Sequence, residues 1–274
     1  MLLTGLPILA MALPQTLAVP GGLVVIDIAP KTSAPTPKVY YEQKPVLVTQ
    51  HQQRWYALVG IPLDAKPGVQ RIIVDDGKRR TSQLFDITDK QYPTQHINIK
   101  DQNQVTPDPE SLKRIYRETD RIQSILNNFD DTSTANWQMV WPLEGRISGL
   151  FGRRRIFNGE PRKPHGGIDI AAKTGTVIMA PADGKVADTG DYFFNGKTIF
   201  IDHGQGLISV YCHLDEINVQ QGETVNKGSR IGTVGATGRV TGPHLHLGIS
   251  LNGTMIEPRI LMPDLPGHPP LATE

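Results

Sequence analysis

The sequence predicts an all-β protein in which two β-rich regions flank a single helix. Short apolar runs of β-forming residues, bounded by Pro, Gly or Asp, recur over 19–100 and again over 137–262. Only one segment between them shows the three- and four-residue apolar spacing of an amphipathic helix. With 22 prolines and 27 glycines in 274 residues, the composition favours strands joined by turns, and the length is sufficient for two domains.

The first residues have the pattern of an export signal. An apolar run over 2–13 precedes the first charged side chain, Asp27, and small residues at Thr16 and Ala18 suit a cleavage site. We therefore expect 1–18 to be a signal peptide and the protein to be exported to the periplasm or cell envelope. The run is short and interrupted by prolines for a bilayer span. An uncleaved membrane tether and a buried apolar strand are the alternatives.

Residues 19–100 are predicted to form a small immunoglobulin-like β-sandwich, because at least five short strands occur there. Asp76 and Gly77 are predicted to form a tight hairpin turn, since glycine accepts the positive φ that such turns require. His51 and His96 stand alone and are interpreted as surface or packing residues. The predicted strands are Leu23–Ile28, Val46–Thr49, Trp55–Ile61, Arg71–Val74 and Gln83–Ile87.

Residues 101–136 are predicted to be a linker followed by a helix. Asp108 can cap the helix, and Pro109 suits its first position, where no backbone N–H is needed. A helix of about 20 residues follows from the apolar stripe. We expect a packed connector, with a coiled-coil pairing as the alternative. The stripe consists of Leu112, Ile115, Ile122, Ile125, Leu126 and Phe129.

Residues 137–262 are predicted to form a second all-β domain, followed by a Pro-rich tail over 263–274. Glycines recur between apolar runs and no helical period appears, which is typical of compact sheets with tight corners. The predicted strands are Thr176–Ala180, Lys185–Asp188, Thr198–Asp202, Leu207–Tyr211, Arg230–Val234 and Leu245–Leu251.

Two short segments in this second region carry the residues that suit a divalent metal. In a strand, His244 and His246 share one face, about 7 Å apart at Cα, which favours one ligand and one catalytic neighbour over two ligands of one ion. His165 and Asp169 flank a Gly-Gly pair that we expect to turn the chain so that imidazole and carboxylate converge. Two histidines and one aspartate leave tetrahedral zinc an open position, as in catalytic sites. The single cysteine, Cys212, excludes an internal disulfide and a cysteine-rich structural site.

Residues 141–258 resemble the lysostaphin/LytM-type zinc peptidases, family twenty-three of the metallopeptidases. Several independent sequence words occur in the order that this family shows. They are Gly145-Arg146-Ile147-Ser148, Phe151-Gly152-Arg153, His165-Gly166-Gly167-Ile168-Asp169-Ile170, Ala180-Pro181-Ala182-Asp183-Gly184, Asp202-His203-Gly204, Tyr211-Cys212-His213-Leu214 and Gly242-Pro243-His244-Leu245-His246.

The resemblance implies a zinc site and a substrate. The family's metal ligands fall on His165, Asp169 and His246, with one Zn²⁺ per chain, and its catalytic histidines fall on His213 and His244. It implies an antiparallel β domain of the LytM/duplicated-hybrid-motif type with a groove across one sheet. It also implies hydrolysis of peptide cross-links or stems of bacterial peptidoglycan.

The expected function is therefore a zinc-dependent peptidoglycan endopeptidase, acting on D-alanyl–diaminopimelate bonds if the source is Gram-negative. The alternative is a non-catalytic LytM-like regulator of a cell-wall amidase, against which the intact five-residue set argues. A net charge of +1 shows no electrostatic footprint for nucleic acid. We expect the N-terminal β domain to dock a protein partner or to cover the groove.

Other polar residues near these sequence words are interpreted mainly as structural. His203 is expected to have a turn role, and Tyr211 either helps to hold an oxyanion or packs in the core. Cys212 is expected to be a buried small residue on the strand face opposite His213. A basic group over 153–155 and 162–163 is either a solvated loop or a contact for stem-peptide carboxylates.

Overall fold

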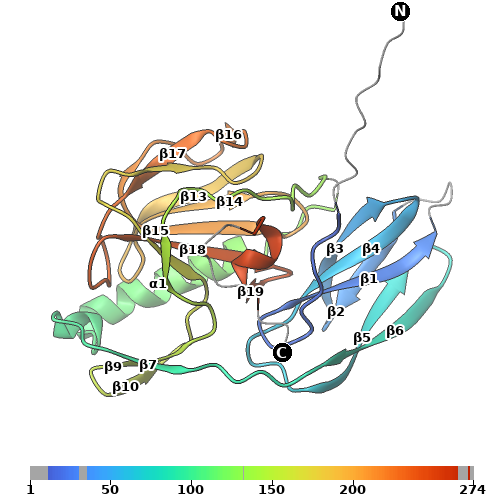
Figure 1. Ribbon diagram of the computed structural model, residues 1–274, viewed down its shortest axis with the longest axis horizontal. Coiled ribbons are helices and arrows are strands. Elements are labelled where there is room, and N and C mark those ends of the chain that lie inside the picture. Colours follow the sequence, from blue (N-terminus) through green and yellow to red (C-terminus); the bar gives the residue numbers. More distant parts are fainter. Residues whose placement is uncertain (1–11, 31–35, 132, 265–270, 272–274) are drawn as a thin grey trace, which may run out of the picture.

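A computed structural model describes residues 12–30, 36–131, 133–264 and 271, and most of its regular secondary structure is β. Two β regions lie side by side, and one helix crosses the end of the second (Figure 1). The strands are β1 (Leu23–Pro30), β2 (Lys38–Tyr41), β3 (Lys44–His51), β4 (Arg54–Gly60), β5 (Gly68–Asp75), β6 (Arg80–Ile87), β7 (Thr94–Ile97), β8 (Arg146–Gly149), β9 (Arg154–Phe157), β10 (Glu160–Arg162), β11 (Ile168–Ala171), β12 (Val177–Met179), β13 (Gly184–Tyr192), β14 (Gly196–Asp202), β15 (Ile208–Ile217), β16 (Thr224–Val225), β17 (Arg230–Val234), β18 (His244–Leu251) and β19 (Thr254–Ile256). The helices are α1 (Pro109–Leu126) and the short 3-10 turns η1 (Gln102–Gln104) and η2 (Pro258–Leu261). The all-β prediction is confirmed.

The N-terminal region is a barrel-like antiparallel sheet in the order β1-β4-β3-β2-β5-β6. Strand β3 is shared: its first residues pair with β2 and the rest with β4, so the sheet bends around one core. That core draws apolar side chains from both halves, including Ile28, Val39, Val59 and Ile72. All five strands predicted here are present, and the predicted sandwich takes this barrel-like form. Gly77, at φ +82° between β5 and β6, makes the predicted turn.

The C-terminal region is built on a larger sheet in the order β16-β13-β14-β15-β18-β11-β8, with β12, β17 and β19 attached at its margins. All six strands predicted here are present. Fully buried Ile168, Tyr211, Leu245 and Leu247 form part of the main core beneath β11, β15 and β18. These three strands are neighbours in the sheet, so they bring distant parts of the sequence to one face.

Helix α1 follows the predicted pattern. Asp108 accepts a hydrogen bond from the Ser111 backbone N–H at 2.7 Å, and Pro109 is the first helical residue. Leu126 is buried and packs with Phe200 and Val210, while Ile122 and Ile125 lie against the same cluster. The helix is therefore a connector packed on the C-terminal sheet, as expected.

A small third sheet was not predicted. Strand β7, in the chain between the barrel and α1, pairs in parallel with β9, which pairs with β10. No local pattern marks this pairing, because the short run Thr94–Ile97 pairs with a strand far along the chain. It places the linker against the hairpin that leads to His165.

Two side-chain amides fasten the barrel to the C-terminal region. Gln205 accepts from the Val48 N–H at 2.9 Å and donates to the Val48 carbonyl at 3.2 Å. Asn252 makes the same pair of bonds to Gly60, at 2.7 Å and 3.1 Å. Each amide thus pairs with both backbone groups of one barrel residue, as a neighbouring strand would.

Part of the predicted signal segment belongs to the folded region. Residues 1–11 lie outside the described part of the chain, as does most of the Pro-rich tail. Leu17 is buried and its backbone pairs with Leu23, while the Ala18 carbonyl accepts from the Thr88 N–H. Cleavage after Ala18 would remove these contacts, and the signal peptide stays a prediction. Within the described residues, no helix is long and apolar enough to cross a membrane.

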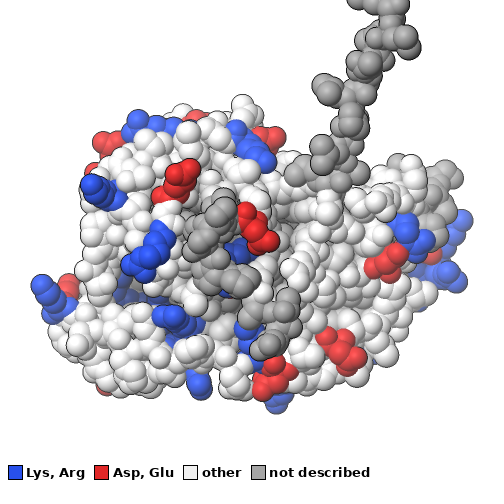
Figure 2. Space-filling model, in the orientation of Figure 1, with Lys and Arg blue, Asp and Glu red and all other residues white. Residues whose placement is uncertain are grey.

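Charge is distributed evenly over the face seen in Figure 2. Basic and acidic side chains are interspersed among uncharged ones there, with no broad field of one sign. This fits the net charge of +1.

Candidate active site

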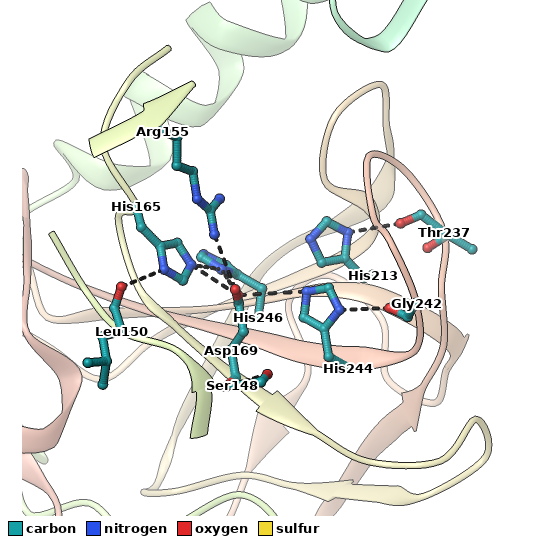
Figure 3. A network of polar contacts seen from close by, with 10 residues as sticks. All are labelled: Ser148, Leu150, Arg155, His165, Asp169, His213, Thr237, Gly242, His244 and His246. Carbon is teal, nitrogen blue, oxygen red and sulfur yellow. Dashed lines mark hydrogen bonds and ion pairs between the residues drawn. The ribbon is translucent and has the colours of Figure 1, made fainter. Parts of the chain in front are cut away.

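Three candidate ligand atoms converge at the meeting of β11 and β18. Asp169 and His246 are opposite each other in the antiparallel register, so their side chains share a face. The Asp169 Oδ1 atom lies 2.9 Å from His246 Nδ1 and 3.0 Å from His165 Nε2, and the two nitrogens are 2.9 Å apart. His165 reaches the same point from the segment just before β11 (Figure 3). Among the described residues, these three form the one such group able to hold a metal ion.

The spacing and chemistry of these atoms fit zinc. Bonds of 2.0–2.1 Å at tetrahedral angles keep neighbouring ligand atoms about 3.3 Å apart. The observed separations are a few tenths of an ångström shorter, a difference that small side-chain rotations remove. Two imidazole nitrogens and one carboxylate oxygen leave further coordination positions open, as a catalytic rather than a structural site requires.

A backbone carbonyl decides which nitrogen of His165 faces the site. His165 Nδ1 lies 2.9 Å from the Leu150 carbonyl oxygen. A carbonyl oxygen can only accept, so Nδ1 carries the proton and the Nε2 lone pair is left for a ligand bond. His165 is fully buried, and this bond fixes both its tautomer and its orientation.

Asp169 is held as a carboxylate. Burial by itself would raise its pKa, but the adjoining His165 and His246 rings outweigh burial and hold the pKa well below its usual range. Its second oxygen, Oδ2, accepts from the Arg155 guanidinium at 3.1 Å. Burial also lowers the pKa of His246, which keeps that ring neutral and able to ligate.

Glycines are needed here for close approach. The chain bends at Gly167, as expected, although neither Gly166 nor Gly167 has a positive φ. A Cβ on Gly167 would lie 2.3 Å from the Leu247 carbonyl and 2.9 Å from the His246 ring. A Cβ on Gly149 would lie 2.2 Å from Asp169 Oδ2. Both positions exclude a side chain because the ligand side chains occupy that space.

His213 reaches the site through a β-bulge in β15. The pairing of β15 with β14 shifts between Tyr211 and Leu214, and His213 has φ +67°, in the left-handed region that non-glycine residues rarely adopt. The bulge turns its ring toward the groove, where its centroid lies 4.9 Å from that of His244 and 6.1 Å from that of His246. Its Nδ1 donates to the Thr237 carbonyl at 2.9 Å, so the Nε2 lone pair is free. Burial lowers the pKa of His213 to about 3.

His244 lies on the same face of β18 as His246, as the alternation predicts. Its Nδ1 donates to the Gly242 carbonyl at 2.9 Å, and its Nε2 lies 3.7 Å from Asp169 Oδ1. The five residues identified from the sequence, His165, Asp169, His213, His244 and His246, are therefore all brought together in one place (Figure 3).

The remaining candidates lie outside this cluster. Tyr211 is fully buried and bonds to Ser209 Oγ, which in turn bonds to buried His203, so these residues form a core network. Cys212 is buried and opposes His246 in register, so it lies on the groove side of the sheet together with the redirected His213. The expectation that Cys212 and His213 occupy opposite faces is wrong, because the bulge breaks the alternation.

The sequence patterns do not identify the side chains that surround the cluster. A cavity of about 180 Å³ is lined by Asp169, His213 and His244 together with Arg155, Arg239 and Gln95, among others. Arg155 was noted only as part of a basic group, and no pattern marked Arg239 or Gln95. They are far apart in sequence, and the pairing of β7 with β9 places Gln95 beside Arg155.

A known protein structure resembles the fold described above. A solved structure described as a peptidase of family M23 from Pseudomonas aeruginosa superposes with a TM-score of 0.74 at 40% identity, covering 89% of this chain and 94% of that one. The chain belongs to peptidase family M23. The family model for peptidase family M23 matches residues 163–258, and the model for the M23 N-terminal domain matches residues 16–90.

Curated M23 relatives include enzymes named for cell-wall chemistry. The peptidoglycan DD-endopeptidase ShyC of Vibrio cholerae is 43% identical over 115 residues, which are 42% of this chain and 27% of that protein. The DD-carboxypeptidase/endopeptidase Mpg of Neisseria meningitidis is 41% identical over 113 residues, 41% of this chain and 26% of that protein. The M23 chain thus spans about a quarter of the length of these relatives in the matched region.

Proposed function

We propose that this protein is a zinc-dependent peptidoglycan endopeptidase that cleaves D-alanyl–diaminopimelate cross-links. The observation that carries the proposal is the convergence of His165 Nε2, Asp169 Oδ1 and His246 Nδ1 beside two further imidazoles. The names of the family M23 relatives, which describe DD-endopeptidases, support the substrate.

His165, Asp169 and His246 would hold a single zinc ion. When bound, zinc polarises the scissile carbonyl and makes water a nucleophile near neutral pH. Arg155 and the Leu150 carbonyl hold Asp169 and His165 in the orientation that ligation needs, as outer partners of metal ligands commonly do.

His213 and His244 would act on the substrate and on the attacking water. Each has its Nδ1 proton donated to a backbone carbonyl, so each offers an Nε2 lone pair to the groove. One can accept the proton of water and pass it to the leaving amine, and the other, once protonated, can donate to the oxygen that gains negative charge. The depressed pKa of His213 leaves its Nε2 unprotonated at neutral pH.

Such an activity places the protein outside the cytoplasm, in the periplasm or cell envelope where peptidoglycan lies. The apolar run at 2–13 supports export. Binding of a protein partner by the barrel stays a prediction.

The test combines metal content with product analysis. Purified protein should contain about one zinc per chain, and incubation with purified sacculi should release muropeptides whose masses show cleaved D-alanyl–diaminopimelate bonds. A protein that binds zinc yet releases nothing, but stimulates a cell-wall amidase, would instead be a regulator. Release of glycan fragments or of stems cut at another bond would contradict the proposed specificity.

A further inference from the structure

Beside the candidate catalytic histidines is an arginine with no carboxylate partner. Arg239 lies in the loop between β17 and β18, and no described acidic residue forms an ion pair with it, whereas Arg155 pairs with Asp169 and Arg162 approaches Glu160 at 3.7 Å. Burial and the neighbouring charges of Arg155 and Arg162 lower the pKa of Arg239 to about 10. Three arginines therefore gather at one end of the groove with only two carboxylates among them.

The structure holds Arg239 firmly in this position. Its guanidinium carbon lies 4.2 Å from the ring centroid of Phe194 and 4.5 Å from that of Phe157, so aromatic rings contact it from two elements. Its backbone N–H donates to the Phe194 carbonyl at 2.9 Å, and its Nη1 donates to the Gln104 carbonyl at 3.3 Å. The charge is thus fixed in place before any ligand arrives, which reduces the entropy lost on binding.

Arg239 and the candidate catalytic residues line one cavity. Asp169, His213 and His244 form one part of its wall, and Arg239, Arg155 and Gln95 form another. The cavity has a volume of about 180 Å³, enough for one small amino-acid residue. An anion seated at Arg239 would therefore belong to a residue next to the scissile bond.

The chemistry of the proposed substrate supplies such an anion. In a D-alanyl–diaminopimelate cross-link, the scissile nitrogen is bonded to a carbon that also bears a free carboxylate. Hydrolysis adds hydroxide to the D-alanyl carbonyl and a proton to that nitrogen, and the released amine keeps its carboxylate. A stem that ends in D-Ala–D-Ala has its terminal carboxylate in the same place. Peptide bonds inside a chain have an amide there instead.

We propose that Arg239 is a specificity-determining residue that binds the α-carboxylate of the amino acid on the leaving side of the scissile bond. This proposal rests on the proposed function. The planar guanidinium suits a carboxylate, and it lines the cavity while two aromatic rings contact it. Arg155 is already bonded to Asp169, so it adds positive charge near the substrate carboxylate without binding that carboxylate itself. The site then selects D,D bonds that have a free carboxylate over internal peptide bonds.

The test compares two synthetic stem peptides that end in D-Ala–D-Ala, one as the free acid and one as the carboxamide. Their dissociation constants are measured by calorimetry with the zinc-loaded His213→Ala protein, in which turnover is suppressed. We expect the acid to bind on the order of 10- to 100-fold more tightly, the range for a hydrogen bond to a charged group. Adding Arg239→Gln should bring the two affinities together, and Arg239→Lys should restore part of the preference.

Arg162→Gln is the matched control. Arg162 also donates to a linker carbonyl, that of Val105 at 2.7 Å, but it does not line the cavity. If Arg239 only fastens the linker, both glutamine variants should have similar melting temperatures and similar acid-to-amide ratios. A preference that survives Arg239→Gln would assign carboxylate recognition to the metal or to Arg155 and overturn the proposal. Equal binding of acid and amide by the parent protein would also overturn it.

Turnover separates this proposal from the proposed function. With otherwise wild-type protein, Arg239→Gln should raise KM for the acid substrate much more than it lowers kcat, and zinc content should be unchanged. If sacculi are cleaved normally by both proteins, the endopeptidase assignment stands and the carboxylate subsite is wrong. If neither protein cleaves sacculi, the proposed function itself fails.

Discussion

The barrel and the C-terminal region are both antiparallel β structures, but they treat polar residues and backbone strain differently. Among the described residues, the buried polar and charged side chains lie between His165 and Glu257, and the barrel buries only the hydroxyl of Tyr41. The barrel places its left-handed non-glycine residues in the hairpin turns at Glu42-Gln43 and Gln52-Gln53. The C-terminal region places one, His213, inside a strand.

This contrast shows that buried polar groups and backbone strain within a strand occur in the C-terminal region, near the candidate site. Left-handed residues in two-residue hairpin turns match the twist of the strands and serve folding alone. A left-handed residue within a strand, next to a buried carboxylate and buried imidazoles, lowers stability and is retained only where the surrounding structure enforces it. We therefore expect function to depend on the identity of the residues around Asp169. In the barrel, we expect residue identity to matter for packing alone.

The largest effect is expected for His246→Ala. Removing one of three ligands should reduce zinc from about one per chain to a small fraction and lower sacculus cleavage on the order of 10⁴-fold, since several kcal/mol of transition-state stabilisation is lost. Metal analysis and muropeptide release measure both. His51→Ala, in the barrel, is the control and should change neither quantity. Equal zinc content in the two variants would remove His246 from the ligand set.

The next effect separates proton transfer from metal binding. His213→Ala or His244→Ala should leave zinc content nearly intact and lower activity on the order of 10²–10⁴-fold, with the double variant less than additive. His203→Ala is the comparison, because His203 is buried in a core network and should affect melting temperature more than turnover of the folded fraction. A stable, zinc-loaded His213→Ala protein with near wild-type cleavage would exclude that residue from the mechanism.

The junction between the two regions offers a smaller effect on stability. Asn252→Ala should lower the free energy of unfolding by about 1–3 kcal/mol, because both backbone groups of Gly60 lose a buried partner. Urea unfolding followed by tryptophan fluorescence measures it. Exposed Asn226→Ala is the matched control and should change little. If Asn252→Ala has no effect, the amide contact does not hold the barrel in place.

The smallest effect is a pH dependence due to His203. Burial lowers the pKa of this ring, whose nitrogens contact the Asp183 carbonyl and Ser209 Oγ, so it stays neutral in the fold. The unfolded chain takes up the proton as pH falls below about 6.5, so stability is lost on acidification from that point, by at most about 1.4 kcal/mol per pH unit. Denaturant unfolding at pH 7.5 and 5 should show a smaller difference for His203→Gln than for the wild type or for exposed His96→Gln. Equal differences in all three would contradict a buried neutral His203.

The local sequence pattern alone predicts many of the structural elements of this protein. Runs of β-forming residues placed five strands of the barrel and six of the C-terminal region. Asp108 and Pro109 marked the start of the helix, and the spacing of His244 and His246 put both rings on one face. These features depend on neighbouring residues only. The five site residues were also identifiable, because sequence words shared with a known family carry them.

Tertiary structure alone decided how these residues meet. The bulge that redirects His213 depends on the pairing of β15 with β14, and the parallel pairing of β7 with β9 depends on where the barrel is fastened. Arg239 has no sequence signal, because its significance lies in the rings of Phe157 and Phe194 and in a cavity shared with Asp169. Contacts between residues so far apart in the chain leave no local period or spacing, and they exist only once the sheets have formed.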